Sequence, residues 1–311
     1  MKDFRNVIFV LIIILFLGEM IITKKENEKV VNEINSTKPI VSVSTFSLYD
    51  IVNHIGQDDI NLVMILPFGV DAHSFEPTPK LMMKIYKSDL VIYNGAGLEP
   101  WIKGIEFKKR VINMSKYVKL RELSHHSKHH QNHHESNIDP HYWLDIENMI
   151  VATDKITTIL SDITPRKRSF YEKNAQEYKN MLKSLDIEYK KSLSQCKHTT
   201  IIVNHNAFSY ISKKYNFDVE ALSGLSPESE PSAKNMLRLI EHIKEHNAST
   251  IFFESFVSDK AIKSIATEMN VAVDVLQPLG NITADEAKRG MSYEDIMKLN
   301  LQKISKALLC N

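Results

Sequence analysis

The segment Arg166–Gln195, RKRSFYEKNAQEYKNMLKSLDIEYKKSLSQ, is a run of about 30 residues that contains neither glycine nor proline. Pro165 stands immediately before it, at a position where proline favours the first turn of a helix. Apolar and aromatic side chains recur in the run at helical spacing, at Phe170, Tyr171, Ala175, Tyr178, Met181, Leu182, Leu185, Ile187 and Tyr189. A helix of this length would extend about 45 Å. We therefore expect a rod that joins two lobes; the alternative is one sheet with an unusually long surface helix.

Short β-branched runs alternate with helical patterns on both sides of this segment. Before it we predict strands at Ile40–Val43, Asn61–Ile65, Leu90–Tyr93 and Val111–Asn113, and helices at Ser47–His54, Pro79–Lys87 and Trp101–Phe107. After it we predict strands at Thr200–Val203, Val219–Leu222, Thr250–Phe253 and Val271–Val275, and helices at Phe208–Lys214, Ala233–His246, Asp259–Met269 and Tyr293–Leu309. Strands spaced by helices indicate parallel sheets. The predicted fold is α/β, with two (βα)4-type lobes at 38–165 and 196–311 and a linking helix at 166–195.

The composition is that of a globular protein. Of 311 residues 43% are hydrophobic and 25% charged, which excludes a disordered chain, a collagen and a polytopic membrane protein. The net charge of +1 argues against a nucleic-acid partner. Nine glycines are too few to favour phosphate-binding loops. The two cysteines, Cys196 and Cys310, either pair in an oxidising compartment or remain buried thiols.

The N-terminal residues indicate export. Lys2 and Arg5 precede the apolar run Val7–Leu17, which is the layout of a signal peptide and is short for a membrane span of about 20 residues. No obvious cleavage site follows, so an uncleaved anchor is the alternative. No cysteine follows either, so we expect no lipoprotein. Residues 1–37 are thus interpreted as a leader or anchor with a polar tether, and the remainder as periplasmic or extracytoplasmic.

Thirteen histidines are the unusual feature of the composition. Six of them lie in the low-complexity loop 124–136, at His125, His126, His129, His130, His133 and His134. His73, His141 and His205 lie in turn-like contexts elsewhere, and His73 and His205 follow predicted strands, where parallel sheets collect ligands. Imidazole suits zinc and neighbouring metals. A single loop histidine is more often a solvated side chain, and spacing alone does not decide between the two interpretations.

Six short motifs occur in order along the chain: Ala72–Pro77 (AHSFEP), Asp139–Asp145 (DPHYWLD), Asn204–Phe208 (NHNAF), Glu230–Ser232 (EPS), Phe253–Glu254 (FE) and Pro278–Gly280 (PLG). Through these motifs the chain, from Pro39 to Asn311, resembles the metal-binding extracytoplasmic receptors of ABC importers, the cluster A-I solute-binding proteins, and is most similar to the zinc receptors. The resemblance implies two α/β lobes bridged by a rigid helix, with a metal cleft between them.

The same resemblance implies a function and a ligand set. His73, His141 and His205 would hold Zn2+ as transported cargo, and the protein would deliver it to an ABC permease as a monomer without enzymatic activity. A histidine-rich loop is taken in zinc receptors to capture or sense zinc; the alternative is a soluble loop that binds divalent ions without specificity.

The fourth ligand is where the chain departs from the family. Many members have an aspartate before the Pro-Leu-Gly motif, where this chain has Gln277, and certain zinc receptors have a carboxylate beside the first histidine, where it has Ala72. The candidates are therefore water, Glu254, Gln277 or a histidine of the loop. The absence of a carboxylate at these two places favours zinc over manganese, which prefers oxygen ligands.

Several alternatives remain open. A manganese or iron receptor would have the same fold, and a three-histidine zinc hydrolase would need a general base, for which Glu254 is the candidate. No sequence feature decides for or against a surface adhesin. His242 and His246 are spaced i, i+4 and could bind a metal, although we interpret them as a solvated helix face. The glycosylation motif at Asn281 carries little weight.

Overall fold

The computed structural model describes residues 38–122, 138–223, 233–246, 248–254 and 260–311. The predicted leader and the histidine-rich loop therefore lie outside the described residues. Contacts divide the chain into two units, Met1–Pro39 and Ile40–Asn311. The elements below all belong to the second unit.

The first sheet is parallel and has the strand order β2-β1-β3-β4. Its strands are β1 (Ile40–Val43), β2 (Asn61–Met64), β3 (Leu90–Tyr93) and β4 (Arg110–Asn113), and its helices include α2 (Phe46–Gly56) and α3 (Pro79–Lys87). The central strands β1 and β3 are mostly apolar, with the buried Ser42 as the exception in β1, because both faces of a covered parallel sheet are buried. Helix α3 begins where Thr78 accepts a hydrogen bond from the Leu81 amide, with Pro79 in its first turn.

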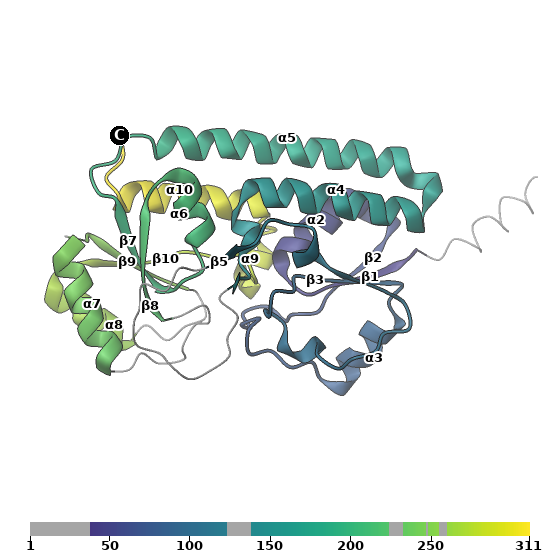
Figure 1. Ribbon diagram of the computed structural model, residues 1–311, viewed down its shortest axis with the longest axis horizontal. Helices are drawn as coiled ribbons and strands as arrows, with labels where there is room; N and C mark the ends of the chain where they lie inside the picture. Colours follow the sequence, from purple (N-terminus) through teal and green to yellow (C-terminus); the bar gives the residue numbers. More distant parts are fainter. Residues whose placement is uncertain (1–37, 123–137, 224–232, 247, 255–259) are drawn as a thin grey trace, which may run out of the picture. The chain divides into compact units, whose positions relative to one another are not determined.

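The second sheet repeats this plan with the order β10-β9-β7-β8, again parallel (Figure 1). Its strands are β7 (Thr200–His205), β8 (Asp218–Ser223), β9 (Thr250–Phe253) and β10 (Ala272–Val275), and its helices are α6 (Ser209–Tyr215), α7 (Ala233–His246) and α8 (Lys260–Met269). The two parallel four-stranded sheets confirm the predicted α/β class with two lobes.

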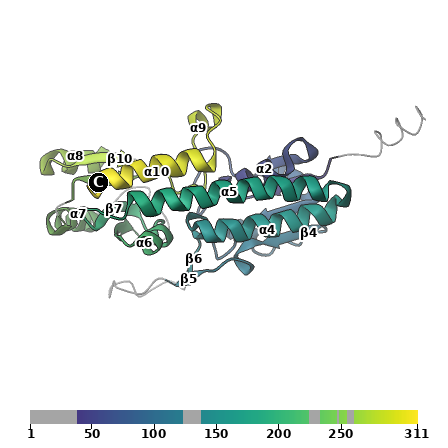
Figure 2. The same ribbon diagram turned by 90° about the horizontal axis from the view of Figure 1, so that it is seen from above.

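A single long helix, α5 (Arg168–Ser192), connects the two sheets in sequence. It has 25 residues, about 38 Å, so it is shorter at both ends than the predicted segment 166–195. Its buried side includes Tyr171, Tyr178 and Tyr189. Helix α5 packs on α2, on α4 (Ile146–Ile163) and on α10 (Tyr293–Ala307), which lie beside it in both views (Figures 1 and 2). The predicted linking helix is therefore confirmed, with corrected ends.

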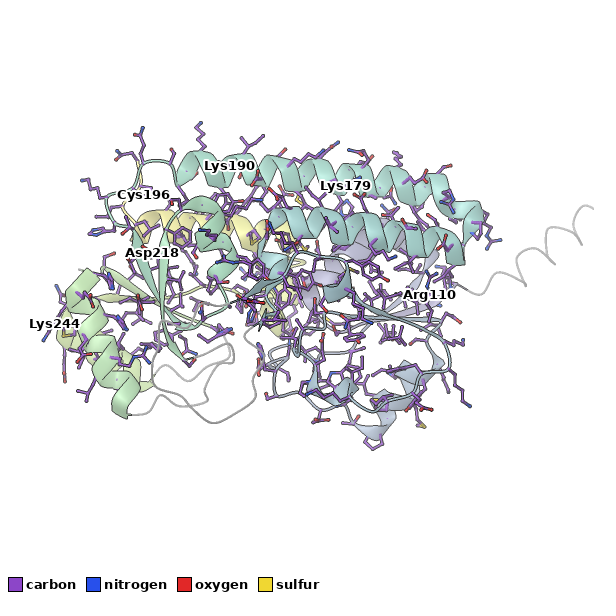
Figure 3. All side chains as sticks on the ribbon, in the orientation of Figure 1. Arg110, Lys179, Lys190, Cys196, Asp218 and Lys244 are labelled. Carbon is purple, nitrogen blue, oxygen red and sulfur yellow. A yellow bond between two sulfur atoms is a disulfide. The ribbon has the colours of Figure 1, made fainter. Side chains whose placement is uncertain are left out.

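Polar contacts tie α5 to its neighbours. The Tyr178 hydroxyl donates to Asp50 of α2 at 2.7 Å, and the Tyr189 hydroxyl donates to the Met297 carbonyl of α10 at 2.7 Å. On the outer side, Lys179, labelled in Figure 3, reaches Asp154 of α4 at 2.6 Å. These contacts join helices that come from both halves of the chain.

Three local expectations need correction or addition. The predicted helix Trp101–Phe107 is wrong, because only a short 3-10 turn forms at Pro100–Ile102 before Gly104 adopts a φ of 79°. A 3-10 turn at Tyr142–Leu144 follows His141, and helix α4, which the Asp145 side chain caps, begins directly after it. Two short strands, β5 (Arg121–Glu122) and β6 (Ile138–Asp139), pair on either side of the histidine-rich loop.

Among the residues described, no helix is both long and apolar enough to cross a membrane.

Buried Glu99 holds the ends of β1 and β3 together. Its carboxylate accepts from the Ser44 hydroxyl at 2.6 Å and from the Asn94 and Gly95 amides at 2.9 Å each. Burial raises the pKa of the Glu99 carboxyl despite these hydrogen bonds. Gly95 has a φ of 82°, and a Cβ there would lie 1.9 Å from the Asn113 side-chain oxygen, so this tight turn requires glycine.

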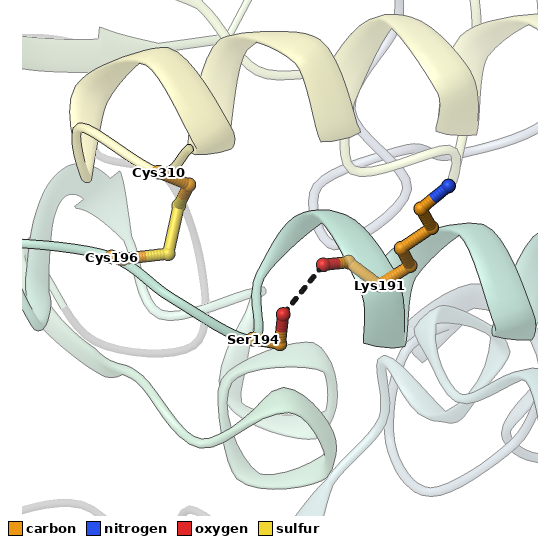
Figure 4. The surroundings of a disulfide bond; sticks show 4 residues. All are labelled: Lys191, Ser194, Cys196 and Cys310. Atoms are coloured by element: carbon orange, nitrogen blue, oxygen red, sulfur yellow. Dashed lines mark hydrogen bonds between the residues drawn. A yellow bond between two sulfur atoms is a disulfide. The ribbon is translucent and has the colours of Figure 1, made fainter.

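Cys196 and Cys310 form a disulfide (Figure 4). The bond closes a loop with a sequence separation of 114 residues and fixes the C-terminus beside the segment that follows α5. Backbone hydrogen bonds from Lys197 to Leu309 and from His198 to Leu308 continue this contact. Of the two alternatives for the cysteines, pairing is the one observed.

Candidate metal centre

His73, His141 and His205 converge on one point. His73 lies in the loop between β2 and α3, His141 follows β6, and His205 is the last residue of β7. The Nε2 atom of His141 lies 3.3 Å from Nε2 of His73 and 3.4 Å from Nε2 of His205. The rings come from both halves of the chain, as the predicted cleft requires. We call this group the three-histidine centre.

The spacing of these nitrogens suits a tetrahedral ion. Two imidazole nitrogens bound to zinc at 2.0–2.1 Å with a tetrahedral angle between them lie about 3.4 Å apart. The observed 3.3 and 3.4 Å separations agree with this value. Two of the three separations thus match those around a tetrahedral zinc ion, and all three ligand atoms lie within 4.8 Å of one another.

The ring of His141 is oriented by Asp139. The Asp139 carboxylate is fully buried and accepts from Nδ1 of His141 at 2.8 Å and from the His141 amide at 2.9 Å. An ionised carboxylate only accepts hydrogen bonds, so the ring proton lies on Nδ1 and the Nε2 lone pair faces the centre. Ser209, in the first turn of α6, donates to the other oxygen of Asp139. The second half of the chain thus helps to fix a ligand that belongs to the first.

Glu254 orients the ring of His205 in the same way. It directly follows β9, it is 6% exposed, and its carboxylate contacts Nδ1 of His205. A carboxylate behind Nδ1 favours the tautomer whose Nε2 is free to bind a metal. The sequence singled out Glu254 as a fourth ligand or a general base; in the structure its carboxylate lies behind a histidine ring.

His73 differs from the other two histidines. Burial, followed by the charges of His141 and His205, holds the pKa of His73 well below its ordinary value. Its ring is therefore neutral at pH 7, which is the form that binds a metal. Within the described residues no carboxylate contacts the His73 ring, so its orientation is not held by a carboxylate at Nδ1 as in the other two histidines.

The loop that carries His73 is held by a residue more than two hundred positions away. The Asn281 side chain donates to the carbonyls of Pro67 at 2.6 Å and Val70 at 2.7 Å. Asp71 also accepts from the amide and the hydroxyl of Ser74 within this loop. Sequence reasoning missed the role of Asn281, whose only signal was its place directly after the Pro278–Gly280 motif. At 2% exposure it is also no accessible glycosylation site.

Gln277 lies near the centre in sequence, yet its side chain is directed elsewhere. It is 3% exposed, and its amide nitrogen donates to Glu286 at 2.9 Å. It does not contribute to the lining of the cavity at the three-histidine centre.

The three-histidine centre encloses a cavity of about 20 Å³. That volume holds roughly one water molecule or one ion. Its lining consists of Val70, Asp71, Ala72, His73, Leu98, His141, Trp143, His205, Glu254, Pro278, Gly280 and Asn281. Trp143 packs against His141, with ring centroids 5.3 Å apart, and donates to the Pro278 carbonyl at 2.6 Å. The site is therefore small, largely apolar at its walls and rich in nitrogen ligands.

Comparisons with known proteins identify the family of the chain. Residues 41–307 match the family described as the periplasmic zinc-uptake complex component A, ZnuA. The high-affinity zinc uptake system protein ZnuA of Bacillus subtilis is 34% identical over 280 residues, which cover 86% of this chain and 87% of that protein. The zinc-binding lipoprotein AdcA of Streptococcus pneumoniae is 31% identical over 272 residues; the chain spans only 54% of its length.

Solved structures show the same fold. The metal-dependent lipoprotein YcdH of Bacillus subtilis superposes with a TM-score of 0.75 at 30% identity, over 87% of this chain and 100% of that one. Both the sequence and the structural matches cover the described unit with its two sheets and long helix.

Proposed function

The chain belongs to the family of periplasmic zinc-uptake component A proteins, and on that premise we propose that it captures Zn2+ outside the cytoplasm and delivers it to an ABC-type permease. It is a zinc-binding solute receptor of an ABC uptake system and, as a member of this family, not an enzyme. The metal ion is its cargo.

We assign the cargo to His73, His141 and His205. The observation that carries this assignment is the tetrahedral spacing of their Nε2 atoms, 3.3 and 3.4 Å from the central ring of His141. Two of the rings present lone pairs to one another, because the carboxylates behind them favour the proton on Nδ1. A cation between the rings relieves this repulsion.

Charge balance supports zinc despite the neutral ligands. The proposed ligands of the three-histidine centre include no carboxylate. Asp139 and Glu254 nevertheless lie close to the ion, because each contacts the Nδ1 atom of a ligand ring, His141 and His205 respectively. Two carboxylates offset the two charges of Zn2+ in a buried site, where an isolated ion is costly. Because all three direct ligands are nitrogens, the site disfavours manganese, which prefers oxygen ligands, relative to zinc.

We propose water as the fourth ligand. Glu254 is engaged with His205, and Gln277 is engaged with Glu286. The histidines of the loop 124–136 lie outside the described residues and stay candidates for a transient fourth contact during capture. The strands β5 and β6 bracket this loop, and β6 leads directly to His141, so zinc caught by the loop is released close to the site.

The same geometry argues against the hydrolase alternative. A hydrolytic zinc needs room for substrate beside the metal-bound water and a base within reach. The cavity of about 20 Å³ has room for the ion and little else. Glu254, the candidate base, lines the cavity, but one oxygen of its carboxylate is taken up by Nδ1 of His205.

We propose that release depends on His73. Its ring lacks the carboxylate partner that fixes the other two, and its loop is held mainly through Asn281. His141 is fixed through Asp139, to which Ser209 of the second half donates, and His205 is fixed by Glu254. Helix α5 packs on helices of both halves. We therefore expect small shifts of the halves and movement of the His73 loop, without a large hinge opening.

The domain boundaries 38–165, 166–195 and 196–311 and the monomeric state stay proposals. The mode of export is a proposal as well: the segment Val7–Leu17 is either a cleaved signal peptide or an uncleaved anchor, and no lipid is attached. The Streptococcus pneumoniae relative is named a lipoprotein, which makes the question a sharp one. Cell fractionation with intact-mass measurement of the exported chain tests it, since a lipid adds a discrete mass.

Metal content measured by mass spectrometry tests the ligand assignment. We expect about one tightly held zinc per chain that is lost in His73→Ala, His141→Ala and His205→Ala. His54→Ala is the matched control, because His54 lies on α2 and packs on Tyr178. Full zinc occupancy in all three variants would remove the basis of the assignment.

A further inference from the structure

A second group of metal-binding side chains lies on the second sheet. Glu220 belongs to β8, and His242 and His246 belong to α7. One ligand atom from each lies within 4.8 Å of the others. We call these three residues the α7 cluster, and we propose that it is a separate Zn2+ site, independent of the three-histidine centre and of its proposed cargo role.

Helical spacing puts the two imidazoles together. His242 and His246 are four residues apart, so both project from one face of α7, the same separation with which helical zinc motifs offer two ligands. Their rings stack with centroids 6.0 Å apart and planes 21° apart.

Strand alternation directs Glu220 toward them. Side chains two residues apart on a strand share a face, so Glu220 and Leu222 point the same way. Leu222 packs with Leu239 and Ile243 of α7 in a buried cluster, which places Glu220 on the α7 side of β8. Figure 3 labels Asp218 and Lys244 on the same two elements.

The contact between strand and helix is close. Oε2 of Glu220 lies 3.7 Å from Nε2 of His242. A zinc ion bound to both atoms at about 2.0–2.2 Å would hold them about 3.4 Å apart. A rotation of the Glu220 side chain, which is 38% exposed, closes this small difference.

Burial argues that His242 is more than a surface side chain. It is 17% exposed and therefore half-buried, which makes it less solvated than the helix face expected from the sequence. Its Nδ1 is buried and has no hydrogen-bond partner among the described residues. The other ring nitrogen, Nε2, faces Glu220 and is the atom that would bind the metal.

The ligand chemistry points to zinc. Two imidazoles and one carboxylate are a common set of three protein ligands for zinc, with a fourth position left for water. The residue after His242 is Ile243, so the glutamate of helical zinc hydrolases is absent and binding is the only activity implied. We find no carboxylate behind either ring in the described residues, and such partners change metal affinity by about 10- to 100-fold. The α7 cluster should therefore bind zinc more weakly than the three-histidine centre.

Equilibrium dialysis of the full chain against Zn2+ alone tests the proposal. The six loop histidines are replaced by glutamine in every sample, so that loop binding does not mask the result. We expect two zinc equivalents, one tight and one weaker. His242→Gln with His246→Gln should lose only the weaker one, and Glu220→Gln should weaken it about tenfold or more. Glu241→Gln and His198→Gln are the controls and should keep both equivalents.

A second measurement guards against a variant that misfolds. Crystals of the unaltered chain grown with zinc should show an anomalous peak at the zinc edge between α7 and β8. The proposal is overturned if that position has no peak, or if the doubly substituted chain keeps both equivalents. The test is separate from that of the cargo site, because His73→Ala should remove the tight equivalent and leave the weaker one in place.

Discussion

The three-histidine centre and the α7 cluster contain similar ligands in different surroundings. In the centre, the rings of His141 and His205 are each held by a buried carboxylate, and the Nε2 atoms already stand at tetrahedral spacing. In the α7 cluster, Nδ1 of His242 has no partner among the residues that the structure describes, and Glu220 is 38% exposed. The difference teaches that the residues behind the ligands, more than the number of histidines, determine how well a site is prepared for its ion.

Removal of a direct ligand should have the largest effect on this contrast. In His205→Ala we expect the affinity of the tight zinc to fall by more than about 100-fold, because direct ligands matter more than the outer partners, whose loss costs 10- to 100-fold. Competition titration against a zinc chelator measures it. The weaker equivalent should remain, and an unchanged tight affinity would contradict the assignment.

Removal of an outer carboxylate should have the next largest effect. Asp139→Asn keeps an acceptor for the His141 amide but loses the charge behind the ring. We expect zinc to bind about 10- to 100-fold more weakly in the same competition titration. Asp154→Asn on α4 is the matched control, since the Asp154 carboxylate pairs with Lys179, away from the three-histidine centre. If Asp139→Asn and Asp154→Asn bound the tight zinc with equal affinity, the carboxylate behind the His141 ring would not contribute to zinc binding.

Deletion of 124–136 separates both clusters from the histidine-rich loop. We expect the chain to lose additional weak zinc equivalents in calorimetric titration, while the tight equivalent keeps its affinity. The reason is that the ligands and their carboxylates all lie outside the deleted residues. An unchanged total stoichiometry would mean that the loop does not capture zinc.

Loss of the disulfide should have the smallest effect on zinc. Cys196→Ser with Cys310→Ser opens a loop of sequence separation 114, which costs about 4–5 kcal/mol of unfolding free energy in the chain-entropy estimate. Denaturant unfolding measures this loss. Zinc affinity at both clusters should be unchanged in the folded protein, because neither cysteine contacts a ligand. A large drop in zinc affinity would show that the Cys196–Cys310 disulfide also stabilises the metal site.

Local patterns in the sequence were sufficient for most of the fold. The helical spacing from Tyr171 to Tyr189 predicted α5, and the β-branched runs predicted all eight strands of the two sheets, because these signals depend on residues a few positions apart. The helix expected at Trp101–Phe107 failed because the chain turns at Gly104. The motifs around His73, His141 and His205 identified the family and its expected ligands.

Only the tertiary structure decided what surrounds those ligands. Asp139 was visible beside His141, but its bond to Ser209 required β7 and α6 to pack near β6. Glu254 reaches His205 only because β9 lies next to β7 in the second sheet. Asn281 holds the His73 loop, and Glu220 meets α7, through contacts between segments that are distant in sequence. Periodicity carries no information about such contacts, because they depend on how sheets and helices pack and not on neighbouring residues.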